Sequence, residues 1–145
     1  EEDEEEEAAA LEEEDEEAQE VADRAYWEHR GSRRTVAMAD ELLQIVRSFD
    51  SQFSLKYNRF YIGLAKGGRT NNFALFRPQK SALRLELRLD QSEEVREQLE
   101  ASGLELMDYH RHTGRYRIRL GEDDVEAHRD LLTDLLRQAY ERSTA

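Results

Sequence analysis

The spacing of apolar residues changes once along this chain, and this change constrains the fold more than any other feature. Before Asp50, apolar side chains recur every three or four residues, which predicts an amphipathic helix over residues 33–49. After Ser51 they alternate, most regularly at four leucines in residues 83–89. Alternation with a period of two predicts strands with one buried face. The chain therefore combines a helical start with a strand-rich middle.

Turn and cap residues divide the remaining sequence. Residues 66–71, which contain two glycines, predict a hairpin loop, and residues 78–81 predict a turn. Thr113-Gly114 predicts the turn of a second hairpin. Ser32 and Ser92 are predicted helix N-caps, because a serine oxygen can accept a bond from an unpaired helical N–H.

We predict an α+β fold, with an antiparallel sheet of about five to six strands packed against the N- and C-terminal helices on one face. A last helix is predicted over residues 123–142, and Gly103 is expected to end a shorter helix with positive φ. Residues 30–145 are predicted to form a single α+β domain with one core. Residues 1–29 are predicted to be an acidic leader or linker, partly helical, whose end Tyr26 and Trp27 dock onto the body.

Charge is distributed unevenly between these parts. Residues 1–29 hold 16 acidic residues and one arginine, a net charge of -15, and the rest holds 18 acidic and 20 basic residues, a net charge of +2. Residues 56–88 hold eight basic residues against a single acid, Glu86. The chain has no cysteine and no long apolar stretch, so we expect a cytoplasmic protein with no membrane partner. Because it begins with acids, we expect it to be part of a longer protein.

The alternation also predicts a basic face of the sheet, opposite the leucines. Arginines occupy alternate positions of two strands, and Tyr61, Ala74 and Phe76 are expected on the same face. Guanidinium groups pair with phosphates and aromatic rings stack on bases, so this face is predicted to bind nucleic acid. The predicted contact residues are Arg84, Arg88, Arg115, Arg117, Arg119, Lys66, Arg69 and Tyr61. The alternative is a solvated surface on which Glu86 bridges Arg84 and Arg88.

Several strings within residues 32–142 resemble a bacterial domain of unknown function found at the C-terminus of chains labelled "predicted transport protein". They are residues 57–64, 72–78 and 83–89, followed by the arginine-rich strand and the ending Gln138-Ala139-Tyr140-Glu141. The resemblance implies an α+β accessory domain within a longer chain. Some chains of this family have nuclease-like partners. The resemblance implies no catalytic residue.

Other candidate chemistry is weaker. Asp108, His110 and His112 alternate near a hairpin and could converge on a metal ion. We expect no metal site, because no further ligand follows at a matching spacing. A nuclease motif would need lysine where Arg88 stands, since arginine does not exchange protons near neutral pH.

The sequence therefore predicts a non-enzymatic accessory domain of a larger protein, with no cofactor and no catalytic residue. Its expected partners are DNA or RNA and an upstream domain of the same chain. The acidic leader is expected to compete with nucleic acid for the basic face. One alternative is a protein-interaction module with an apolar patch around Tyr57, Tyr61, Phe76 and Tyr109. The other is a metal-dependent hydrolase using Asp108, His110 and His112.

Overall fold

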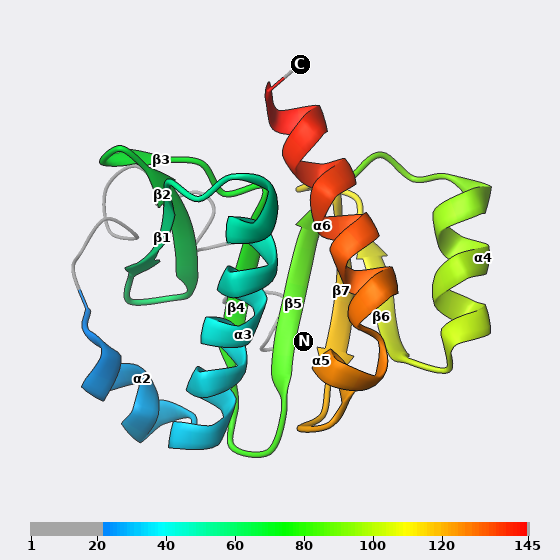
Figure 1. Cartoon of the computed structure of the whole chain (residues 1–145). Helices are drawn as coiled ribbons and strands as arrows, with labels where there is room; N and C mark the ends of the chain where they lie inside the picture. Colours follow the sequence, from blue (N-terminus) through cyan, green and yellow to red (C-terminus); the bar gives the residue numbers. More distant parts are fainter. Residues whose placement is uncertain (1–21, 145) are drawn as a thin grey trace.

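The computed structural model describes residues 22–144. Residues 1–21 of the predicted leader lie outside the described residues. The helices and strands follow in the order shown in Figure 1: α2 (Arg24–Arg30), α3 (Arg33–Phe49), β1 (Phe53–Tyr57), β2 (Ile62–Lys66), β3 (Arg69–Thr70), β4 (Ala74–Pro78), β5 (Leu83–Arg88), α4 (Glu93–Ser102), β6 (Glu105–His110), β7 (Arg115–Leu120), α5 (Asp124–Ala127) and α6 (Arg129–Thr144).

The strands form one antiparallel sheet with the order β1-β2-β4-β5-β7-β6, and the short β3 pairs with β2. The chain passes through α4 and β6 before β7 returns to pair with β5, so β6 lies at the edge. Its register with β7 shifts between Met107 and His110. The predicted α+β class and antiparallel sheet are confirmed, with seven strands rather than five or six.

The helices α3 and α6 lie side by side in front of the sheet (Figure 1) and cover the leucine face of β5. The predicted burial of the leucines is confirmed, because Leu83, Leu85 and Leu87 are fully buried and Leu89 nearly so. Leu42 of α3 and Leu132 of α6 are buried in the same core. This helix layer leaves the opposite face of the sheet to the alternate side chains of β4, β5 and β7.

The helix α2 packs on the body through Trp27, as the sequence predicted. The Trp27 side chain is buried, and its Nε1 donates a hydrogen bond of 2.8 Å to the carbonyl oxygen of Asn58. Tyr26, its neighbour, stays exposed at the surface. The helix runs from Arg24 to Arg30 and so continues across residues 29 and 30.

The predicted caps are confirmed. Ser32 and Thr35 form a reciprocal capping box at the start of α3, and the Ser92 hydroxyl accepts a bond from the N–H of Val95. Gly103 ends α4 with φ of 81°. The predicted single last helix is instead two helices, since His128 leaves helical angles between α5 and α6. Apolar spacing carries no signal for this break, because the buried positions stay in phase on both sides of it.

The predicted face of Ala74 and Phe76 is wrong. Both residues pair with leucines of β5, at Ala74↔Leu87 and Phe76↔Leu85, and both are fully buried in the core under the helices. Their neighbours Leu75 and Arg77 occupy the opposite face. The sequence did not show which residues of β4 face the helices, because β4 is buried on both faces and its apolar residues do not alternate.

Just before β4, the side chain of Asn72 takes the place of a backbone partner for β2. Asn72 Oδ1 accepts a hydrogen bond of 2.9 Å from the N–H of Leu64 in β2. Gly63 permits this approach, since a Cβ at that position would lie 2.3 Å from Asn72 Oδ1. The side chain of Asn72 therefore sets where β4 starts beside β2, which in turn sets the face on which Arg77 lies.

Candidate anion-binding face

The register of three strands brings six arginines onto the face opposite the helices. The pairs Arg84↔Arg119 and Arg88↔Arg115 join β5 to β7, and Arg77 of β4 lies opposite Arg84. Glu86 lies among them, paired in register with Arg117. We call this set the arginine face: Arg77, Arg84, Arg88, Arg115, Arg117, Arg119 and Glu86.

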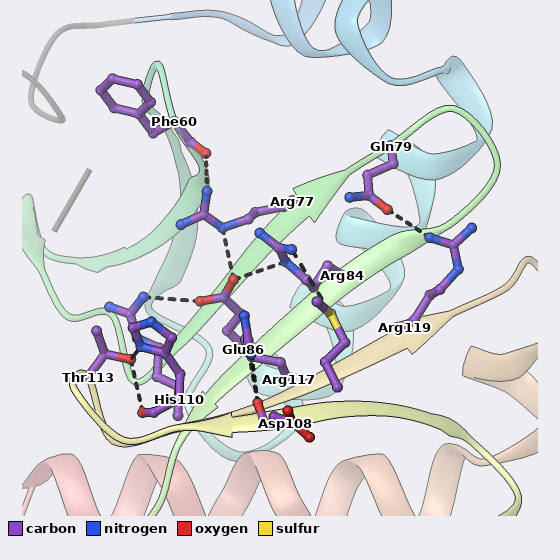
Figure 2. Close-up of polar contacts among 12 residues, drawn as sticks. Phe60, Arg77, Gln79, Arg84, Glu86, Asp108, His110, Thr113, Arg117 and Arg119 are labelled. Carbon is purple, nitrogen blue, oxygen red and sulfur yellow. Dashed lines mark hydrogen bonds and ion pairs between the residues drawn. The ribbon is translucent and has the colours of Figure 1, made fainter. Parts of the chain in front are cut away.

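Glu86 is the centre of the arginine face (Figure 2). Its Oε2 accepts hydrogen bonds from the Nε atoms of Arg77, at 2.9 Å, and Arg84, at 3.2 Å. Its Oε1 accepts a bond of 3.1 Å from Arg115 Nη1, and the Glu86 side chain is fully buried. Three guanidinium groups from three adjacent strands therefore share one carboxylate.

The surrounding arginines control the ionisation of Glu86. Its burial favours the neutral acid, but the charges of Arg77, Arg115 and Arg84 outweigh this effect, and the pKa of Glu86 is lowered. Burial also lowers the pKa of Arg115, and the Glu86 charge opposes that change. The centre of the face is therefore an ionised cluster.

Arg77 and Arg115 retain hydrogen-bond donors that have no acceptor in the described part of the chain. Arg77 Nη2 and Arg115 Nε and Nη2 are buried and have no hydrogen-bond partner among residues 22–144. The two side chains are 8% and 0% exposed. Buried N–H groups are nearly always paired, and a guanidinium group pairs best with an oxygen-bearing anion. The arrangement suits an additional anion beside Glu86.

Arg117, which is buried, and Arg119, which is partly exposed, form the border of the face toward β6 and the β4–β5 turn. Arg117 donates bonds of 3.0 Å from Nε and 2.8 Å from Nη2 to the carbonyl oxygen of Asp108. Arg119 Nη1 donates to Gln79 Oε1 at 3.0 Å, and the Arg119 side chain is 39% exposed. Arg119 is thus a member of the face that a large ligand can reach.

Five of the eight predicted contact residues lie together, namely the five predicted arginines. Lys66 lies elsewhere, because its Nζ is 2.6 Å from Asp50 Oδ2 beside the end of α3, and its hydrogen bond lowers the pKa of Asp50. Arg69 is exposed in β3, away from the cluster. Arg77 was missed, because β4 is buried on both faces and its apolar residues do not show which face Arg77 occupies.

The predicted aromatic platform is not formed. Tyr61 packs against Leu75 on this face but is 2% exposed, so its ring offers no surface for a base. The apolar patch proposed for an interaction module is not formed either, since Phe76 is in the core and Tyr57 and Tyr109 are partly buried against it. Tyr26 is the sole exposed large apolar side chain within residues 22–144.

The hydrolase alternative lacks a formed metal site in the described chain. No group of three His, Cys, Asp or Glu residues within residues 22–144 is placed to hold a metal ion. The rings of His110 and His112 are 6.3 Å apart and nearly perpendicular, and His110 Nδ1 lies 2.7 Å from Thr113 Oγ1. Asp108 is exposed on β6.

We expect zinc or manganese to leave the melting temperature of this protein nearly unchanged. A metal bound only by the folded state would raise it by mass action. Thermal melts across a metal titration provide the measurement. A rise in melting temperature that disappears in a His110→Ala, His112→Ala double variant would instead support the hydrolase alternative.

No helix within residues 22–144 has the length and apolar character needed to cross a membrane. Comparison of the chain with protein-family models, with curated proteins and with solved structures found no match.

Proposed function

We propose that the protein is a non-enzymatic accessory domain of a larger protein and binds nucleic acid through the arginine face. The observation that carries the proposal is the set of buried donors on Arg77 and Arg115 without a partner in the described chain, beside a carboxylate shared by three guanidinium groups. A phosphate oxygen would satisfy such donors, and the planar fork of arginine matches phosphate geometry.

The layout of the face favours a polyanion over a single small anion. Its arginines come from three neighbouring strands, which lie roughly 5 Å apart in a sheet. Arg88 of β5 and Arg119 of β7 are partly exposed, so a ligand that carries several phosphates can contact both at once. Because Tyr61 is buried, the proposed binding depends on phosphate contacts rather than base stacking, and little sequence preference is expected.

The acidic N-terminal segment is proposed to compete for the same arginines. Residues 1–20 contain 14 acidic residues and no basic residue. A tethered competitor acts at a high effective concentration, so the full chain should bind nucleic acid more weakly than a chain without this segment. In this proposal the segment regulates access to the arginine face.

Deletion of residues 1–20 is expected to strengthen binding of a single-stranded oligonucleotide, and added salt is expected to weaken it. The affinity should fall with salt because bound arginines displace counterions from the phosphates. Fluorescence anisotropy with a labelled oligothymidylate, between about 50 and 200 mM salt, measures both effects. Arg119→Glu should weaken binding further and reduce the slope of log affinity against log salt by about 0.7.

The matched control is Arg137→Glu, which makes the same charge change on α6 in the helix layer. Arg137 is exposed and lies over the ring of Phe49, away from the arginine face. Arg119 is chosen over Arg117 because the Arg117 side chain donates two bonds to Asp108 and its loss would disturb β6. Absence of salt-sensitive binding by the truncated chain at low ionic strength would overturn this proposal.

A further inference from the structure

A second site adjoins the arginine face where α2 meets the turn between β4 and β5. The structure has a pocket of about 300 Å³ here. Four cations line it, and no acidic side chain among the described residues does so: the cations are Arg30, Arg77, Lys80 and Arg84. This volume is at the lower end of the range for small-molecule sites, so it suits one compact ligand.

Two of the cations are held in place by hydrogen bonds to the buried Glu86. Arg77 and Arg84 both donate from Nε to Glu86 Oε2, and Arg77 Nη1 also donates to the carbonyl oxygen of Phe60 at 3.1 Å. Figure 2 shows the two guanidinium groups between Phe60 on one side and Gln79 on the other. Side chains fixed in this way lose little further entropy when an anion binds.

The other two cations come from the rim. Lys80 Nζ donates a bond of 2.8 Å to the carbonyl oxygen of His29, which is uncharged. An ammonium group has three donors, so Lys80 can contact an anion while keeping this bond. Arg30 lies over the ring of Trp27, with its Cζ 5.4 Å from the ring centroid.

The remaining wall is partly aromatic. Trp27 and Phe60 line the pocket beside the cations. Trp27 is buried with Arg30 over its ring, so the partly exposed Phe60 is the aromatic side chain that a ring attached to a compact, doubly charged head would contact. A phosphate monoester carries a charge of about -1.5 to -2 at neutral pH, whereas each phosphodiester within a strand carries -1. Arg77 and Arg84 share the charge of Glu86, but Arg30 and Lys80 bring two further positive charges, so the pocket favours the monoester.

We infer that this pocket binds the terminal phosphate of a nucleic acid strand, together with part of its last nucleotide. The inference rests on the proposed function, because Arg77 and Arg84 belong to both the pocket and the arginine face. It adds a feature that the face alone lacks: the protein would distinguish strand ends that carry a phosphate from those that carry a hydroxyl group. The strand would continue from the pocket along β5 and β7.

The test compares oligothymidylates of one length that carry a 5′-phosphate, a 3′-phosphate or hydroxyl groups at both ends. The full chain is expected to bind one of the phosphorylated strands about tenfold more tightly than the hydroxyl strand, as charge-assisted bonds to the terminal phosphate imply. Lys80→Gln should bring this ratio close to one, and the matched Arg137→Gln should leave it unchanged. Thermal melts establish that both variants are folded.

The outcomes separate the two proposals. Equal, salt-sensitive binding of all three strands would overturn the terminal-phosphate site and leave the proposed function standing. Absence of binding to any strand, also after deletion of residues 1–20, would overturn both. Inorganic phosphate that displaces the phosphorylated strand at the concentration at which a nucleoside monophosphate does so would assign the pocket to free phosphate and overturn its role at a strand end.

Discussion

Replacement of Glu86 by glutamine is expected to lower the free energy of unfolding by about 3 to 5 kcal/mol. The change keeps the shape of the side chain but removes the negative charge that Arg77, Arg84 and Arg115 share. Three buried guanidinium groups would then repel one another in a region of low dielectric constant, with one amide oxygen as their common acceptor. Urea unfolding of the two proteins measures the difference.

Glu100→Gln provides the matched control. Glu100 also pairs with an arginine, at 3.0 Å from Arg96 Nη1, but both side chains are about half exposed. Its loss is expected to change stability little, because exposed ion pairs contribute little. Equal stability losses in the Glu86 and Glu100 variants would show that the arginine face does not depend on its central charge.

The stability that Glu86 contributes is also expected to depend on pH. Because its pKa is lowered in the folded protein, the unfolded chain takes up this proton first as the pH falls. The contribution is therefore complete above the unfolded-state pKa of about 4.3 and is lost as the pH falls through the folded-state value. The stability difference between the wild-type protein and Glu86→Gln should shrink accordingly when unfolding is measured from pH 7 toward pH 3.

Leu85→Ala is expected to destabilise the protein by about 2 to 5 kcal/mol, since it removes a buried side chain and leaves a cavity. Leu85 is fully buried and pairs across the sheet with Phe76 on one side and Ile118 on the other. Denaturant unfolding measures the loss. Leu131→Ala, at a partly exposed position of α6, is the control and should cost clearly less. A similar cost at both positions would contradict a core centred on β5.

The sequence was sufficient to predict those elements whose pattern depends only on neighbouring residues in the chain. The leucines of β5 alternate without interruption, and Ser32, Ser92 and Gly103 act at the residues where they stand. These features depend on the nearest neighbours in the chain. Their periods and cap chemistry therefore predict them without knowledge of the rest of the fold.

The arginine face was predicted only in part, because its properties arise from residues that are distant in sequence. The alternation placed the arginines of β5 and β7 together, but the phase of β4 depends on Asn72 and its bond to Leu64. Charged strands are usually solvated on their outer face, so the full burial of Glu86 had no signal in the pattern. The bond between Glu86 and Arg115 spans 29 positions and follows from the crossover through α4 and β6.

The register shift in β6 bears on how this protein behaves at high concentration. An edge strand in regular register offers a row of unpaired backbone groups to a second molecule, and such rows promote edge-to-edge aggregation. In β6 the row is interrupted between Met107 and His110, and the exposed Glu105 and Asp108 place negative charges along it. A copy of the same strand would meet like charges and a broken hydrogen-bonding pattern. The β6 edge of the sheet therefore resists the growth of intermolecular β-structure.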